Sequence, residues 1–398
     1  MTPSKEKEQS PSSSVSPRVI RLFDPHFHLW DITPTIEPEG EDDTTTISGH
    51  DGRLFFAPSG SNLYGRTEYE GEVVNGNSND NATANACCWS GENKTTTTVV
   101  HEGGICIEAD SVCFVDRPGS ELTPKYRQEL DWTLDQLENN NSNNTDHSQK
   151  QQESCNNNTT SGPSKKTYGF LACASLESPG IDSWLAEIAS KRQQGGVPLC
   201  GIRQILNYQP SWPRNDSLGE LLTDERWKRG FRLLADQNLV FDLQLNPSQF
   251  GAALAVLRET PGARVVINHA GTPTLTDLIN PDKQEVYWDG LGALAECPGV
   301  VGIKISMLSY TDPIHWDTNP VVVEAVHRII EMFGVQRVAF ASNAPVDGNG
   351  NSSEEETLCW PVSRVLAAFD AMTASKYTEE ERSWLFAEAA KKMYGLRT

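Results

Sequence analysis

Two histidines near the amino-terminal end of the sequence carry its clearest chemical signal. His26 and His28 alternate with Asp24 in the segment Asp-Pro-His-Phe-His, and apolar residues surround that segment. In an extended strand, alternate side chains point to the same face, so the pattern predicts that these three polar groups converge. Two imidazoles and a carboxylate on one face of an apolar strand indicate metal binding or acid–base chemistry. The competing interpretation is two histidines whose rings are satisfied by backbone carbonyls at a strand end.

The composition limits the partners of such a site. The chain has 398 residues, with 33 Lys and Arg against 54 Asp and Glu, which gives a formal net charge of −21. This charge opposes binding to nucleic acids and anionic membranes, and no run of 18 apolar residues is present. We therefore expect a small-molecule substrate, no nucleic acid and no membrane; the oligomeric state is left open.

The cysteines and the first residues point to a compartment. None of the nine cysteines has C-x-x-C spacing, and several lie in apolar segments where a free thiol acts as a small hydrophobic group. Residues 1–18 are rich in Ser, Pro, Lys and Glu and lack the apolar core of a secretory signal. The sequence thus predicts a reduced, cytoplasmic protein.

Eight short apolar segments alternate with helical patterns along the chain. The expected strands are 20–28, 104–108, 168–174, 201–206, 240–245, 264–269, 301–306 and 338–342. The expected helices are 123–137, 181–194, 223–238, 247–259, 288–296, 320–333 and 379–393. This alternation is typical of an α/β fold, and a doubly wound sheet is the alternative. The count of eight and the polar residues at the strand ends favour a (β/α)8 TIM barrel.

Three segments interrupt this pattern. Residues 1–20 read as a disordered tail, while residues 40–98 and 139–166 are rich in Asn, Thr, Gly and Ser without apolar periodicity. We expect one barrel over residues 21–396 that carries the last two segments as low-complexity surface insertions.

Polar residues gather where the expected strands end, and in a TIM barrel that rim carries the active site. Taken singly, each has a structural explanation; Lys304, for example, could form an ion pair inside the barrel. The convergence of many such residues at one rim is harder to explain structurally. The group consists of His26, His28, Glu108, Arg203, Gln204, Asp242, Gln244, His269, Lys304, Ser306 and Asn343.

These residues lie in motifs whose order and spacing resemble the amidohydrolase superfamily, specifically its amidohydrolase-related, lactonase-like branch of metal-dependent hydrolase barrels. The motifs are Asp-Pro-His-Phe-His-Leu-Trp at 24–30, Ile-Glu-Ala at 107–109, Gly-Ile-Arg-Gln-Ile-Leu at 201–206, Val-Val-Ile-Asn-His-Ala-Gly at 265–271, Val-Gly-Ile-Lys-Ile-Ser at 301–306, Ala-Ser-Asn-Ala-Pro-Val at 341–346 and the segment 385–394. The resemblance covers nearly all of the chain outside the tail and the two insertions. It implies a TIM barrel that hydrolyses small molecules.

The sequence departs from the metal-binding members of that family at three positions. Gln244 and Asn343 stand where those members carry a histidine and an aspartate, and Arg203 stands where a bridging lysine would be needed. An asparagine amide is neither an anionic ligand nor a base. His26 and His28 alone are fewer than the three protein ligands usual at a catalytic zinc site. These residues predict no cofactor with certainty. At most, we expect one divalent metal such as zinc, held weakly by these two histidines.

The resemblance and the residue types together predict the hydrolysis of a small lactone or related cyclic ester that bears a carboxylate or several hydroxyls. Water would attack the carbonyl carbon, with His269 as the base. The expected catalytic residues are His26, His28, His269 and Asn343. The expected substrate-binding residues are Glu108, Arg203, Gln204, Lys304 and Ser306, with Arg203 and Lys304 on a substrate carboxylate. Asp24 would orient a histidine.

Two other functions fit the same residues. One is a metal-dependent decarboxylase of the same family, which the loss of ligands at Gln244 and Asn343 disfavours. The other is a catalytically impaired barrel that binds a metabolite, which Asn343 favours and the three histidines disfavour.

Overall fold

The computed structural model describes residues 18–31, 63–74, 87–90, 96–109, 124–138, 166–194, 196–210, 219–347 and 360–396. Most of the tail expected over residues 1–20 and most of the insertions expected over 40–98 and 139–166 lie outside these ranges. The expectation of disorder is wrong for residues 18–20, which begin the first barrel strand. Within the ranges, the structure contains no helix long and apolar enough to cross a membrane.

Eight parallel strands form a nearly closed barrel, which confirms the predicted TIM-barrel fold. In spatial order the strands are β1 (Arg18–His28), β5 (Thr96–Ile107), β6 (Thr167–Cys173), β7 (Leu199–Ile205), β8 (Val240–Gln244), β9 (Arg264–Ile267), β10 (Val300–Ile305) and β11 (Val338–Phe340). A short strand, β4 (Cys87–Ser90), pairs antiparallel with β5, and β2 (Trp30–Asp31) pairs with β3 (Leu63–Tyr64). Each of the eight predicted strand segments coincides with one barrel strand.

The ring closes between its first and last strands just beyond the end of β11. The His28 amide donates to the Ala344 carbonyl at 2.7 Å, and the Asn343 amide donates to the His26 carbonyl at 2.8 Å. These bonds bring the His-x-His motif against the segment that follows the last strand.

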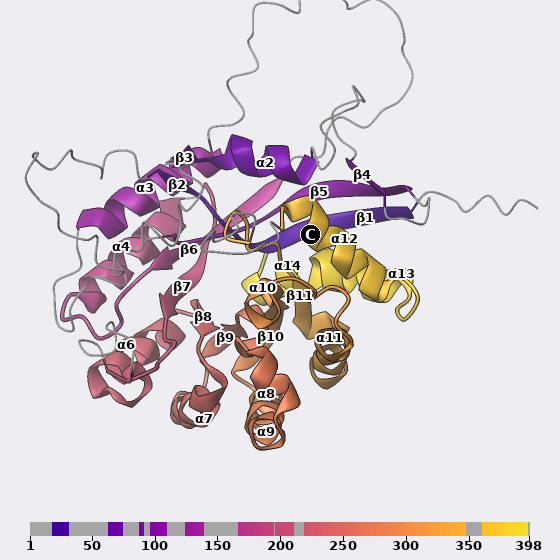
Figure 1. Cartoon of the computed structure of the whole chain (residues 1–398). Coiled ribbons are helices and arrows are strands. Elements are labelled where there is room, and N and C mark those ends of the chain that lie inside the picture. The colour runs from indigo at the N-terminus through magenta and orange to yellow at the C-terminus, as the bar shows by residue number, and fades with distance from the viewer. Residues whose placement is uncertain are drawn as a thin grey trace, which may run out of the picture.

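Helices surround the strands in chain order, as Figure 1 shows. They are α2 (Arg66–Val74), α3 (Pro124–Glu138), α4 (Ile181–Gln194), α6 (Glu225–Asp236), α7 (Phe250–Glu259), α8 (Leu275–Ile279), α9 (Pro281–Glu296), α10 (Leu308–Thr311), α11 (Pro320–Phe333), α12 (Val362–Thr373), α13 (Glu379–Ser383) and α14 (Ala389–Tyr394). The helices expected at 181–194 and 320–333 are confirmed residue for residue. The helix expected at 288–296 begins earlier, because Asn280 caps it through the Lys283 amide and Pro281 occupies its first turn.

Part of the first expected insertion belongs to the core. Tyr64, Tyr69 and Val73, on β3 and α2, are buried in the main hydrophobic cluster, and the Tyr69 ring stacks on Phe27 at 3.9 Å between centroids. The prediction that residues 40–98 lie outside the core is therefore wrong for residues 63–74. Helix α2 has nine residues, few of them apolar, and therefore gives a weak periodic signal, although Tyr69 and Val73 pack into the core.

Side-chain alternation divides the core into an outer and an inner layer. Residues such as Phe241 and Leu243 of β8 pack in the large cluster between strands and helices. Val240 of the same strand belongs to a second cluster with Phe23, Val266 and Tyr394. Met393 and Tyr394 of α14 enter this inner cluster, so the closing helix packs against the barrel interior at the end where the strands begin.

The cysteines differ from expectation at one position. Among the described cysteines, Cys106, Cys200 and Cys297 are free. Cys173, in the apolar strand β6, is disulfide-bonded, so the expectation that cysteines in apolar segments are free thiols is wrong for this residue.

Candidate active site

The end of β1 carries an irregularity that separates Asp24 from the histidines. Three residue steps from Asp24 to Phe27 lie opposite only two steps on β5, which is a bulge. Asp24 therefore turns toward Tyr69, whose hydroxyl donates to it at 2.9 Å. The prediction that Asp24 shares a face with His26 and His28 is wrong, because the bulge breaks the alternation.

Asp24 instead joins the first strand to the last. Its carboxylate accepts the amides of His26 at 3.2 Å and Ser342 at 3.1 Å, and the Ser342 hydroxyl at 2.5 Å. It thus orients the backbone around His26, rather than a histidine ring as expected.

The three predicted histidines come together in the barrel interior. The Nε2 atoms of His26 and His28 lie 3.2 Å apart, and the His26 and His269 ring centroids lie 4.6 Å apart. The Nδ1 atom of His28 lies 2.9 Å from the Glu108 carbonyl oxygen, to which it donates. In neutral His28 this contact makes Nε2 the acceptor in its contact with His26 Nε2.

His269 is held by its neighbour on the next strand. It follows β9 with a positive φ of 53°, and its Nδ1 atom lies 2.9 Å from the Ser306 hydroxyl at the end of β10. Ser306 was expected to contact substrate, but in the structure its hydroxyl contacts this ring. When the Nδ1–H group donates to the Ser306 oxygen, the Nε2 atom of His269 is free to act as a base.

Burial and nearby cations keep all three imidazoles neutral. Burial, followed by the charge of Arg203, lowers the pKa of His28 to about 3. The pKa values of His26 and His269 are also well below the usual range, through burial first and then through the charges of Lys304 and Arg203. Neutral imidazoles can accept a proton or hold a metal, as imidazolium cannot.

Arg203 occupies the interior beside these rings. One terminal nitrogen donates to the Glu108 carboxylate at 2.8 Å and the other donates to the Gln244 side-chain oxygen. Two of the residues that were expected to bind substrate, Arg203 and Glu108, thus contact each other. The Arg203 Nε atom is buried and has no partner among the described residues.

Lys304 does not face a substrate. It is fully buried and forms an ion pair with Asp242, which also accepts the Tyr394 hydroxyl at 2.7 Å. Burial lowers the pKa of Lys304 to about 8. The expectation that Lys304 binds a substrate carboxylate is corrected, because Asp242 already occupies its ammonium group.

The last barrel strand places Asn343 at the mouth. Asn343 has a positive φ of 55°, and its side-chain amide donates to the Asp347 carboxylate at 3.3 Å. Asp347 also accepts the Ser309 hydroxyl at 2.9 Å and the Met307 amide. Sequence reasoning missed Asp347, since it follows a Pro-Val turn rather than a strand.

Asn268 is a second residue of the site that was not predicted from the sequence. It is fully buried, and its amide oxygen and nitrogen make no hydrogen bond within the described part of the chain. Alternation from Val266, an inner residue, places its side chain inside the barrel. A buried amide without partners normally contacts water or a ligand.

Gln204 points away from the histidines. Its side-chain oxygen accepts the Leu176 amide and the Trp227 indole, at 3.1 and 2.9 Å, and its nitrogen donates to Glu177 at 2.9 Å. The structure therefore places it in the helix layer, because it is adjacent to the inward-facing Arg203 in the chain.

We expect Gln204→Leu to destabilise the fold without changing the KM for substrate. The substitution leaves the Glu177 carboxylate and the Trp227 indole without their partner, and a buried unsatisfied group costs about 1–3 kcal/mol. Urea denaturation and steady-state kinetics would measure the two effects. A large increase in KM with unchanged stability would return Gln204 to the substrate site.

The donor set provides part of a metal site. Two nitrogens 3.2 Å apart fit the spacing of two ligands on one zinc ion, since zinc–nitrogen bonds are about 2.0–2.1 Å long. The Glu108 carbonyl fixes the His28 tautomer, as such sites require. Among the described residues, no group of three His, Cys, Asp or Glu side chains is arranged to hold a metal. His26 and His28 are the residues that would hold a metal here.

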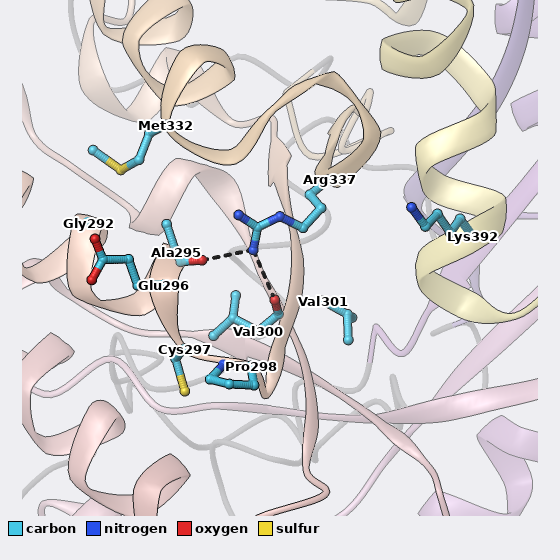
Figure 2. Close-up of a pocket in the computed structure, with 10 residues that line it drawn as sticks. All are labelled: Gly292, Ala295, Glu296, Cys297, Pro298, Val300, Val301, Met332, Arg337 and Lys392. Atoms are coloured by element: carbon cyan, nitrogen blue, oxygen red, sulfur yellow. Dashed lines mark hydrogen bonds between the residues drawn. The ribbon is translucent and has the colours of Figure 1, made fainter.

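A surface hollow lies at the opposite end of the strands. Figure 2 shows it beside Val300, at the start of β10, with Arg337 donating to the carbonyls of Ala295 and Val300 at 2.8 and 3.4 Å. In TIM barrels the active site lies at the carboxyl ends of the strands, so this hollow is not the candidate site.

Comparison with known proteins agrees with this geometry. An amidohydrolase from Burkholderia multivorans, solved with bound HEPES, superimposes with a TM-score of 0.58 at 17% identity over 96% of this chain and 100% of that one; a second structure of it, with bound zinc, gives 0.58 at 16% identity over the same shares. An amidohydrolase from Bifidobacterium longum subsp. infantis gives 0.51 at 18% identity, over 95% of this chain and 100% of that one. These likenesses support the fold.

Sequence comparison identifies the family. The uncharacterized protein y4mH of Sinorhizobium fredii is 30% identical over 229 residues, which cover 57% of this chain and 69% of that protein. The profile of the family described as Amidohydrolase matches residues 23–396, from the first barrel strand to the closing helix. The chain therefore belongs to the amidohydrolase family.

Proposed function

We propose that this protein hydrolyses a small lactone or related cyclic ester by attack of water on the carbonyl carbon. The observation that carries the proposal is the cluster of His26, His28 and His269, three buried imidazoles of lowered pKa at the end of the barrel where the strands terminate. Family membership agrees with a hydrolytic reaction.

The imidazoles divide the work. His269 takes the proton of the attacking water at Nε2 while Ser306 holds its Nδ1 atom. The positive charge of Arg203, which disfavours imidazolium in the free protein, also stabilises the negative charge that develops on the carbonyl oxygen. Because Arg203 is held in place before the reaction, little reorganisation is needed as the oxyanion forms.

Unpaired polar atoms offer contacts for the substrate. His26 Nδ1, Arg203 Nε and both amide atoms of Asn268 are buried without hydrogen-bond partners in the described structure. Substrate oxygens or ordered water would satisfy them. The terminal nitrogens of Arg203 contact Glu108 and Gln244, so a substrate carboxylate would have to displace one of these partners.

A divalent metal such as zinc would be held by His26 and His28 through their Nε2 atoms. When bound, it would polarise the carbonyl and lower the pKa of a bound water. Asn343 leaves the site without an anionic ligand at the last strand, and its amide contacts Asp347 instead.

A pH-indicator assay over a panel of aliphatic and aromatic lactones tests the proposal, with protein as purified, after chelation and after addition of zinc. We expect turnover of at least one lactone, which the His269→Ala variant loses. Release of carbon dioxide from an aromatic acid without lactone turnover would establish the decarboxylase alternative. Tight binding of a metabolite without turnover in all three states would establish the binding protein.

A further inference from the structure

We propose that Asp347 is the general acid of this site, which protonates the leaving oxygen when the ring of the substrate opens. This inference rests on the proposed lactone hydrolysis and deepens it, since His269 accounts for the proton of the water but no residue yet accounts for the proton of the leaving group.

The position of Asp347 places its carboxyl group at the correct rim. Ser309 and Met307, which donate to it, follow β10, and Asn343, which also donates to it, follows β11. Both strands end at the barrel mouth, so the carboxyl lies between their ends. The residue as a whole is partly exposed, in contrast to the fully buried Asp242 and Asp24, but its carboxyl group is buried.

The residues that hold Asp347 also position the histidines. The backbone amide of Asn343 donates to the His26 carbonyl at 2.8 Å. Ser306 precedes Met307 in the chain, and its hydroxyl lies 2.9 Å from the Nδ1 atom of His269. The carboxyl group is therefore anchored to the same two chain segments as two of the three imidazoles. The Ser309 and Asn343 side chains both donate to Oδ1, which orients the carboxyl and directs the other oxygen away from them.

Its environment supports a proton donor. Burial raises the pKa of Asp347 to about 7, while the hydrogen bonds from Ser309, Asn343 and Met307 oppose that rise. No charged side chain from the described elements packed around it contributes to the shift. A carboxyl that keeps its proton near neutral pH can deliver it to a leaving alkoxide.

The proton balance of the reaction is complete. His269 takes a proton from water as the new carbon–oxygen bond forms. The ring carbon–oxygen bond then breaks, and the Asp347 proton moves to the departing oxygen. The products are a hydroxy acid, an imidazolium on His269 and a carboxylate on Asp347. Transfer of the proton from His269 to Asp347 through solvent restores the starting state.

The test compares two leaving groups in the Asp347→Asn variant. An alkoxide needs protonation as it leaves, whereas a phenolate does not, so the probes are δ-valerolactone and dihydrocoumarin. We expect kcat to fall about 10²–10⁴-fold with δ-valerolactone and by less than about tenfold with dihydrocoumarin. Asp289→Asn, the same change at an exposed position on α9, is the matched control and should leave both rates unchanged.

Equal losses with both probes, or no loss with either, would overturn the proposal and leave Asp347 a structural residue. If the wild-type protein opens neither lactone, the proposed function itself fails, which the wild-type measurement alone reveals.

The pH profile of the wild type remains informative if Asp347→Asn folds poorly, and the melting temperature adds a further test if the variant folds. In the wild type, kcat with δ-valerolactone should decline above about pH 7, whereas kcat with dihydrocoumarin should not; parallel profiles would contradict the assignment. In addition, between pH 4 and 7 the unfolded chain releases this proton while the folded protein retains it. The Tm of the wild type should therefore fall relative to that of the variant as pH rises through this range, and a constant difference would contradict a protonated Asp347.

Discussion

His269→Ala is expected to lower kcat about 10²–10⁴-fold for the lactones that the wild type opens, which is the usual worth of a positioned general base. KM should change little, because the imidazole acts on water rather than on the bound ester. The ring is at the barrel rim and is held mainly by Ser306, so its removal leaves the core intact. Steady-state kinetics and circular dichroism would measure the two effects.

His327→Ala is the control for this experiment. His327 is also a buried imidazole, but it lies on α11 in the helix layer, where its Nδ1 atom lies 3.1 Å from the Tyr377 hydroxyl. It should retain full kcat. Added imidazole should partly restore the His269→Ala rate by occupying the vacated space. Unchanged kcat in His269→Ala would place the base elsewhere.

Lys304→Met is expected to produce the largest loss of stability of any single substitution considered. Lys304 and Asp242 are both 0% exposed, and removal of the ammonium leaves a buried carboxylate without its counter-charge. Such a change typically costs about 3–5 kcal/mol. Chemical denaturation would report it as a lower midpoint with an unchanged slope.

The matched variant removes the whole polar group. Lys304→Met, Asp242→Val and Tyr394→Phe together replace the buried ion pair and the tyrosine hydroxyl that contacts it. This triple variant should be about as stable as the wild type, since apolar replacement of a complete buried pair is often neutral or stabilising. If it is as unstable as Lys304→Met alone, the loss comes from packing rather than from the uncompensated charge.

The sequence predicted the barrel because the fold depends on periodicity. The strands around Val240 and Val265 are buried on both faces and rich in apolar residues, and this pattern survives errors of one or two residues at each end. Sequence reasoning missed helix α12, because the residues before this helix give no clear start signal: Pro361 at the N-cap makes no side-chain hydrogen bond.

The site was harder to predict, since it depends on register. His26, His28 and Arg203 meet as expected because alternation holds at their strand ends. His269 joins them because the backbone after β9 leaves the extended conformation at this residue, which has a positive φ of 53°. Asp24 does not join them because of a bulge in β1, and a single sequence gives no signal that predicts such a bulge.

Sequence reasoning could not predict which of the buried side chains form hydrogen bonds and ion pairs with one another. Lys304 was assigned to substrate because the sequence could not show that Asp242, two strands away and also facing inward, forms an ion pair with it. Asp347 was overlooked because its position depends on the turn after Asn343, whose positive φ is a property of the fold.

The bonds that close the barrel have a consequence for how the protein folds. The His28–Ala344 and Asn343–His26 contacts join segments more than 300 residues apart, and such distant contacts form slowly because a long loop must close first. The histidine cluster is complete only when this closure has occurred. Enzymatic activity is therefore a reporter of the finished ring, and folding intermediates with most of their helices formed should be catalytically silent.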